Sequence, residues 1–159
     1  TRAPGSFVQT SAALRALMNN HIHIEVRIVL SRINEHGITE LASLISKQYP
    51  ATSRVCFMAM EMTGEARNNL ALLWISYKRA FDSCRDGIRI LMNHGIDVRL
   101  YNFPLCTVSK SYWPICYNSI SPEKIRYLYA CSDCEVNDVC GGVFAGTLPF
   151  LKQEINAVS

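Results

Sequence analysis

Helical and extended patterns alternate along the first hundred residues, and this order constrains the fold more than any other feature. Apolar residues recur at every second position in 22–30, a short apolar run fills 55–60, and a third extended segment covers 96–101. Helical patterns cover 7–19, the segment between Gly37 and Pro50, and 77–94, while 62–76 reads as part loop and part helix. Strands that alternate with helices form βαβ units, so the sequence predicts an α/β fold with three parallel strands.

Three strands are too few for a complete doubly wound sheet or a closed barrel. An open edge on a parallel sheet is unfavourable, so we expect a partner chain or poor solubility.

The sequence pattern changes after the third strand, where prolines and cysteines interrupt the periodic spacing of apolar residues. We therefore expect two parts, an α/β part in 1–105 and a cysteine-rich, mostly irregular part in 106–159. Within the second part, the sequence Ser121-Pro122-Glu123 predicts a short helix to about Tyr129.

Composition excludes several classes of function. The chain has 159 residues, of which 49% are hydrophobic and 18% charged, which is ordinary for a globular protein. The net charge of +3 is scattered, so we expect no nucleic-acid partner. The longest apolar stretch, 70–75, is too short to span a bilayer, and we expect no membrane association. An odd cysteine count without a secretory signal favours a reducing, cytoplasmic location with thiols kept for metal.

The cysteine spacing carries the strongest chemical signal in the chain. Cys131-x2-Cys134-x5-Cys140-Gly-Gly places three thiols in one short stretch, and Cys106, directly after a predicted strand, is the favoured fourth. Four converging thiolates suit zinc or an iron–sulfur cluster, which share ligands and overlap in spacing. Cys116 competes with Cys106 for the fourth position. The two remaining cysteines, Cys56 and Cys84, fit plain core positions in a strand and a helix.

Polar residues at the predicted strands form a second set of candidates. Glu25 and Arg27 lie mid-strand on the face opposite the apolar one. Since both faces of a parallel sheet are normally covered, a charged residue there favours contact with substrate or cofactor. Ser31 follows the end of this strand and Glu61 the end of the next. Functional groups of parallel sheets gather at these carboxyl ends.

Three segments together resemble the second half of a radical S-adenosylmethionine (SAM) enzyme. They are Ile24-Glu-Val-Arg-Ile-Val-Leu30, Phe57-Met-Ala-Met-Glu-Met-Thr-Gly64 and Val98-Arg-Leu-Tyr-Asn-Phe-Pro-Leu-Cys106, followed by the terminal cysteine cluster. More narrowly, the chain is similar to the radical SAM maturase of the His-Xaa-Ser peptide-modification system. The resemblance covers nearly the whole chain, and its most specific parts are Tyr-Asn-x-Pro-Leu-Cys and the cysteine cluster.

The resemblance implies a partial (β/α)6 barrel in which a [4Fe-4S] cluster and SAM generate a 5′-deoxyadenosyl radical. That radical abstracts hydrogen from a peptide substrate, and the complete enzyme needs an electron donor. By position, Arg27 and Ser31 would contact the SAM carboxylate and ribose, and Glu61 would face SAM or substrate. Cys106, Cys131, Cys134 and Cys140 would bind an auxiliary [4Fe-4S] cluster that anchors the peptide, accepts an electron or holds the tail in shape.

The sequence departs from the family in one decisive respect. It contains neither the Cys-x3-Cys-x2-Cys loop that binds the SAM cluster nor the Gly-Gly-Glu expected after the second strand. We therefore expect a C-terminal half that does not cleave SAM by itself. Two alternatives remain open: a stand-alone interaction module that binds zinc through the same four cysteines, and a non-catalytic subunit completed by a partner maturase chain.

Overall fold

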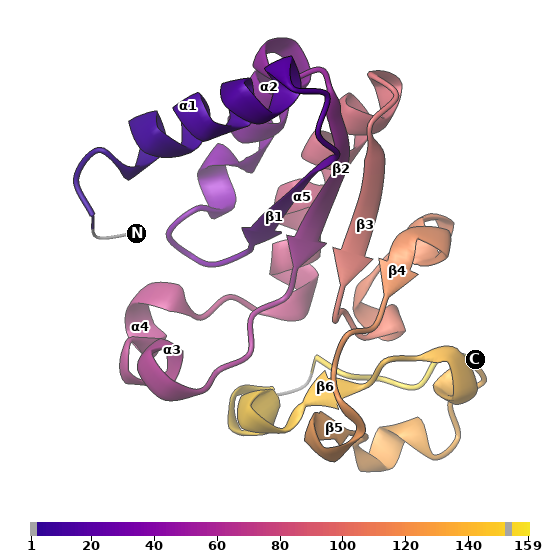
Figure 1. The fold of residues 1–159 in the computed structure, drawn as a ribbon. Helices are drawn as coiled ribbons and strands as arrows, with labels where there is room; N and C mark the ends of the chain where they lie inside the picture. The colour runs from indigo at the N-terminus through magenta and orange to yellow at the C-terminus, as the bar shows by residue number, and fades with distance from the viewer. Residues whose placement is uncertain (1–2, 152–153) are drawn as a thin grey trace.

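The computed structural model describes residues 3–151 and 154–159. Helices and strands alternate through the first two thirds of the chain, and shorter elements follow (Figure 1). The elements in chain order are α1 (Ser6–Asn19), β1 (Ile24–Val29), α2 (Ile38–Gln48), β2 (Thr52–Met58), α3 (Gly64–Asn68), α4 (Leu70–Leu73), α5 (Tyr77–Asn93), β3 (Asp97–Tyr101), β4 (Cys116–Tyr117), β5 (Ile125–Arg126) and β6 (Val143–Phe144).

The main sheet has four parallel strands in the order β1-β2-β3-β4. This confirms the α/β class and the three predicted strands, and it adds β4. That strand is only Cys116–Tyr117, which pair with Leu100 and Tyr101. A two-residue strand has too little alternation to be recognised in a sequence, and only its neighbour β3 defines it.

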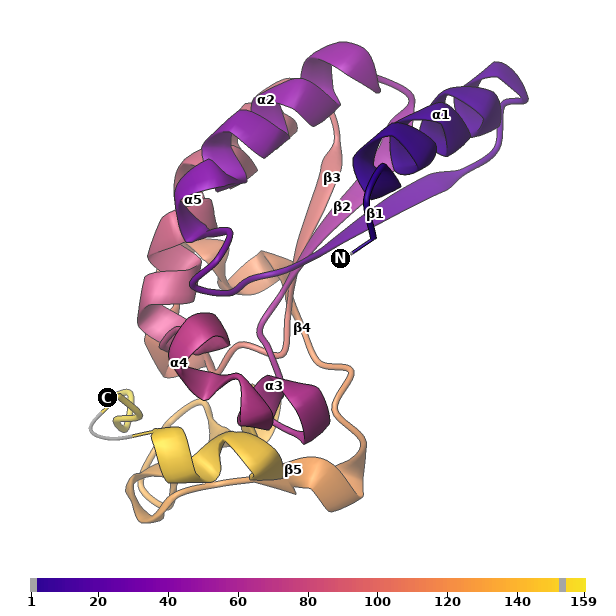
Figure 2. The ribbon, with the colours of Figure 1, turned by 90° about the vertical axis from the view of Figure 1, so that its left-hand side faces the viewer.

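One face of the sheet is apolar and covered by helices. The rows Val26, Val55, Val98 and Ile28, Phe57, Leu100 lie side by side on this face, and five of these six residues are buried. Helices α2 and α5 cover it together (Figure 2). Gly87 of α5 allows the close approach, because a Cβ there would lie 3.2 Å from the Cβ of Ala42 in α2. Burial of this face supplies most of the hydrophobic stabilisation of the fold.

The opposite face of the sheet is polar. Its first row holds Glu25, Arg54 and Asp97, and the next holds Arg27, Cys56 and Arg99. Arg54 donates to both neighbouring carboxylates, at 2.5 Å to Asp97 Oδ2 and 3.3 Å to Glu25 Oε2. Helix α1 lies on this side, next to β1 (Figure 2). The side chains of Arg27 and Asp97 are 62% and 47% exposed, whereas those of Glu25, Arg54 and Arg99 are only 24–25% exposed, so this face is open to solvent at Arg27 and Asp97 and half-buried between them.

Helix α5 begins and ends where the sequence predicts. The Ser76 side chain accepts a hydrogen bond from the Arg79 N–H and so caps the first turn. At the other end, Gly95 has a φ of +75° and its N–H bonds to the Met92 carbonyl. A left-handed residue after the last turn is a common helix end, and glycine adopts it without strain.

The segment after β3 is built from short 3-10 turns and one antiparallel pair, β5 with β6. The predicted helix from Pro122 to about Tyr129 is wrong. Only Pro122–Lys124 forms a single 3-10 turn, and Ile125 and Arg126 then pair with Phe144 and Val143. Tertiary pairing therefore overrides a good local helix start. The ambiguous segment 62–76 contains the two short helices α3 and α4.

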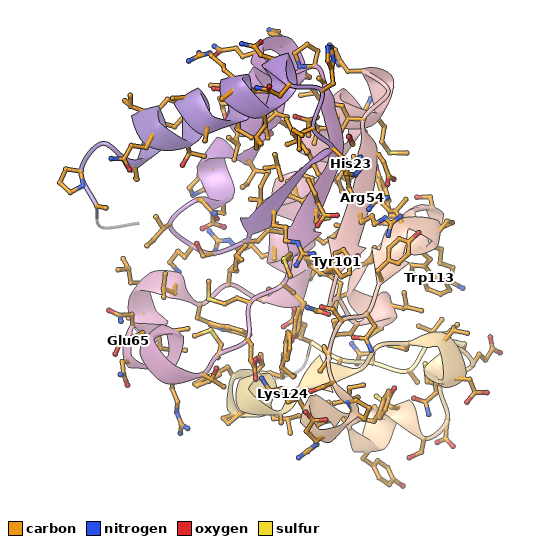
Figure 3. The ribbon with its side chains drawn as sticks, in the orientation of Figure 1. His23, Arg54, Glu65, Tyr101, Trp113 and Lys124 are labelled. Atoms are coloured by element: carbon orange, nitrogen blue, oxygen red, sulfur yellow. The ribbon has the colours of Figure 1, made fainter. Side chains whose placement is uncertain are left out.

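The last third of the chain lies at the carboxyl ends of the parallel strands (Figure 1). Thr147 is fully buried, and its Oγ1 accepts a hydrogen bond of 3.3 Å from the Met62 N–H, directly beyond β2. Lys124 Nζ lies 3.2 Å from Glu61 Oε2, below the strand ends (Figure 3). These two contacts join the cysteine segment to the sheet. In the part of the chain described, no helix is long and apolar enough to cross a membrane.

The covered face makes a prediction about stability. Leu91 on α5 is fully buried, whereas its neighbour Met92 is 50% exposed. We expect Leu91→Ala to lower the free energy of unfolding by about 2–5 kcal/mol through the lost burial and the cavity left behind. Met92→Ala removes a side chain of similar size and should change it by less than about 0.5 kcal/mol. Urea denaturation measures both, and equal effects would contradict the described packing of α5.

Candidate metal centre

Four cysteines line one pocket at the carboxyl end of the sheet. Cys106 lies in the 3-10 turn directly after β3, and Cys131 ends another turn at Tyr129–Cys131. Cys134 follows in the next loop, and Cys140 precedes β6. All four line a narrow pocket of about 20 Å3 that is partly open to solvent. The fold thus brings together the residues that the sequence singled out, although 25 residues separate Cys106 from Cys131.

The rest of the pocket wall is mainly apolar. Pro104, Val136, Val143 and Ile155 contribute aliphatic surface. Arg126 is the charged residue of the wall, and no carboxylate of the described residues lines it. Several thiolates together with the group that they bind carry negative charge. A wall with one guanidinium and no carboxylate suits such a group, because no neighbouring anion repels it.

Backbone N–H groups point at two of the sulfurs. The Leu105 N–H donates to Cys140 Sγ at 3.5 Å, and the Val158 N–H donates to Cys134 Sγ at 3.3 Å. The hydroxyl of Tyr127 donates to the Cys140 carbonyl at 2.8 Å. Such outer contacts orient ligand side chains and stabilise thiolates.

Asn137 adds a polar group to the pocket wall. Its Oδ1 is buried, and within the described residues it has no hydrogen-bond partner. A buried amide without a partner is uncommon in folded proteins. The two ends of an amide exchange by a simple rotation, so this position can also present an N–H to the pocket.

The pocket requires a glycine at position 142, which has no side chain. Its φ is +63°, and a Cβ there would lie 2.8 Å from Ile125 Cγ2 and 2.9 Å from the Arg126 carbonyl oxygen. The chain after Cys140 therefore runs directly against β5 with no room for a side chain. The Gly-Gly pair in the sequence indicated a close approach, but it did not indicate that β5 is the element approached.

Burial raises the pKa of the Cys106 thiol, and the neighbouring Cys140 and Cys131 thiols raise it further. A raised pKa disfavours a free nucleophilic thiolate at neutral pH. A bound metal reverses this effect, because coordination removes the proton from the thiol.

Cys116 lies apart from this pocket. It lines a different pocket with Asn118, Val139 and Gly141. Its Sγ lies 3.5 Å from the Tyr112 carbonyl, and burial raises the pKa of the thiol to about 12. Cys56 and Cys84 are buried in β2 and α5, where the sequence placed them. All seven cysteines are free thiols.

The four sulfurs are not gathered around one point. Within 3–151 and 154–159, no group of three or more His, Cys, Asp and Glu side chains is placed to hold a metal ion. A tetrahedral zinc site needs its four sulfurs about 3.8 Å apart, given zinc–sulfur bonds of about 2.3 Å. The cysteines share a pocket without meeting this requirement, so a single ion would require them to move together.

The other candidates lie on or near the sheet, each with its own partner. Arg27 Nε donates to Glu25 Oε1 at 2.7 Å. Ser31 is buried, and both its N–H and its hydroxyl bond to Asn34 Oδ1. Glu61 pairs with Lys124, as above. No hydrogen bond or ion pair joins any two of Arg27, Ser31 and Glu61 in the described part of the chain, so their roles toward SAM stay predictions.

Sequence reasoning missed two supports of the cysteine pocket. The Trp113 indole N–H lies 3.0 Å from both the Leu105 and Val108 carbonyls and so holds the turn that carries Cys106. Ile155 and Asn156, near the end of the chain, close another side of the pocket. A tryptophan in an irregular segment was a signal for a local anchor, whereas nothing in the sequence of the last residues indicated their position.

Comparisons with family models, with curated proteins and with solved structures return no match for this chain. The interpretation of the site therefore depends on the chemistry of its own residues.

The close approach at Gly142 gives a prediction. Gly142→Ala places a methyl group against β5 and imposes a left-handed φ on alanine, so we expect a loss of about 2–4 kcal/mol in the free energy of unfolding. The control is Gly95→Ala, where φ is also positive but no atom lies within 4 Å of the new Cβ. It should cost only about 1 kcal/mol. Equal losses in the two variants would contradict the described contact with β5.

The polar face predicts a pH dependence. Hydrogen bonds from Arg27 and Arg54 hold the pKa of Glu25 below its usual value, and Arg54 does the same for Asp97. The folded state therefore binds fewer protons than the unfolded state, and stability should fall as the pH drops from about 5 to about 3. In Arg54→Met, the free energy of unfolding should decrease less steeply over this pH range.

The matched control is Arg89→Met, which removes a cation from an exposed pair on α5 with Asp86 and should leave the pH profile parallel to that of the wild type. Unfolding free energies measured across this pH range decide the question. A profile equally steep in Arg54→Met and wild type would show that the polar network does not hold these carboxylates ionised.

Proposed function

We propose that the cysteine pocket binds an auxiliary [4Fe-4S] cluster through Cys106, Cys131, Cys134 and Cys140. The observation that carries this proposal is the convergence of these four residues, which come from separate parts of the sequence, on one pocket. An iron–sulfur cluster places each cysteine on a different iron, so its ligands stand farther apart than those of a single zinc ion.

The residues around the pocket fit such a cluster. The wall is apolar apart from Arg126, Asn137 and Asn156, and two backbone N–H groups already face Cys134 and Cys140. Hydrogen bonds to the sulfurs and limited solvent access are the features by which proteins set the potential of these clusters. When bound, the cluster would supply electron transfer, because four cysteines leave no iron open for a substrate.

We further propose that the chain is the C-terminal half of a radical SAM enzyme similar to the His-Xaa-Ser maturases, with a ribosomally made peptide as substrate. Support comes from the segments that resemble the family and from the position of the cysteine pocket at the carboxyl edge of a parallel sheet. Active sites of α/β proteins form at this edge. The remaining barrel strands, the SAM cluster and the electron donor would belong to the complete enzyme.

The polar sheet face favours a related candidate, a subunit that completes its sheet with a partner chain. Parallel sheets are normally covered on both faces, yet Arg27 and Asp97 on this face are 62% and 47% exposed. On either proposal, further structure covers this face. Arg27 would then lie inside the assembly, where its guanidinium could bind a carboxylate of SAM.

Reconstitution under anaerobic conditions tests the cluster. With iron and sulfide, we expect about four of each per wild-type chain and a broad visible absorption. Cys134→Ala and Cys106→Ala should both lose the cluster, whereas Cys116→Ala, a matched control outside the pocket, should retain it. One tightly held zinc with no stable iron–sulfur species would refute the cluster and support the zinc-binding module. If Cys116→Ala loses the cluster and Cys106→Ala retains it, the assignment of Cys106 as the fourth ligand is refuted.

A further inference from the structure

The final residues of the chain cross the cysteine pocket as an extended segment, which we call the closing strap (Glu154–Val158). Ile155 is buried and belongs to the hydrophobic core, while Asn156 is exposed on the outer side. Both line the pocket. The strap thus forms one wall of the proposed cluster site, although it is distant in sequence from Cys106.

Hydrogen bonds fix both ends of the strap. At its start, Glu154 Oε1 accepts a bond of 2.7 Å from the Lys78 N–H in the first turn of α5, where N–H groups lack partners within the helix. At its end, the Val158 carbonyl accepts a bond of 3.0 Å from the Glu135 N–H. One anchor lies on α5 and the other on the loop after Cys134.

The strap contacts one of the four sulfurs directly. The Val158 N–H donates to Cys134 Sγ at 3.3 Å. Cys106 and Asn156 line the cysteine pocket together, and both also line a second, more open pocket of about 280 Å3 beside Lys78 and Asp82. The strap and Cys106 therefore separate the cysteine pocket from this solvent-filled groove.

We propose that the closing strap positions Cys134 for ligation and limits access of solvent and reagents to the sulfurs of Cys134 and Cys106. The contacts and the shielding belong to the protein alone, and only the identity of the ligated group rests on the proposed function. N–H donors to thiolates stabilise their negative charge and raise the potential of a bound cluster. The strap would thus influence both the lifetime and the potential of the cluster.

The first test uses the wild-type chain without metal. Backbone exchange followed by NMR should show the Val158 amide more protected, relative to its intrinsic rate, than the amide of Ala157, whose N–H has no acceptor among the residues described. Equal protection of the two amides would overturn the proposal, and this measurement requires no substitution.

The second test compares Val158→Pro, which removes the N–H donor, with Val158→Ala, which keeps it. In the metal-free protein at about pH 10, where exposed thiols are ionised in both proteins, iodoacetamide should label Cys134 up to about fivefold faster in Val158→Pro than in wild type, because the thiolate loses the hydrogen bond that stabilises it and the cover of the strap. Val158→Ala should react at the wild-type rate. Cys131, which has no bond to the strap among the described residues, serves as the internal reference.

Labelling of the buried Cys84 reports global unfolding. If Cys84 reacts in Val158→Pro, that variant is unfolded. The amide exchange of Val158 and Ala157 in the wild-type chain then tests the proposal. In the reconstituted protein, a chelator should bleach the cluster faster in Val158→Pro than in Val158→Ala.

The two proposals fail in different ways. Unchanged Cys134 labelling in a folded Val158→Pro variant overturns the strap, whatever metal the wild type binds. Faster labelling, together with a wild-type chain that forms no cluster, overturns the cluster and retains the strap as a cover for the cysteine pocket.

Discussion

The burial of one apolar sheet face beneath α2 and α5 is the constraint on which the rest of the structure depends. This layer fixes β1, β2 and β3 in parallel, so their carboxyl ends all point toward one edge. The chain returns to that edge after β3, and Thr147 and Lys124 attach the returning segment to the residues beyond β2. The cysteine pocket is positioned by these contacts. A local defect in the α/β layer would therefore move the pocket as well.

The two faces of the sheet are in different physical states. The covered face is apolar and packed, whereas the polar face holds charges that pair with one another, and the buried Nε of Arg99 has no hydrogen-bond partner among the described residues. Arg99 lies over the ring of Tyr117, 4.3 Å from its centroid, which extends the polar network to β4. Such a face is stable in water, yet it also offers cations and aromatic rings to a covering chain or a small anionic ligand. The exposed cations and aromatic rings on a parallel sheet therefore support the proposal that further structure covers this face.

Much of the fold was predictable because periodic patterns specify long elements. The alternation in 22–30 and the amphipathic pattern of α5 each extend over several turns or residue pairs, and tertiary packing agrees with them. The predicted helix after Pro122 failed because its local signal covered one turn, and pairing of Ile125 with Phe144 outweighed it. For the site, spacing alone selected Cys131, Cys134 and Cys140, and the strand end selected Cys106. The strap residues could not be selected, since the contacts of Val158 and Asn156 depend on where the chain returns and not on their own side chains.

The central claim is that the cysteine pocket holds a four-iron cluster and not a single zinc ion. The most direct measurement is the metal bound when the chain is produced in cells supplied with both iron and zinc and isolated without oxygen, followed by Mössbauer spectroscopy of the iron. We predict iron in a cubane environment with about four irons per chain, all carrying sulfur ligands. A stoichiometric zinc ion with thiolate coordination, and iron only at background level, would contradict this account.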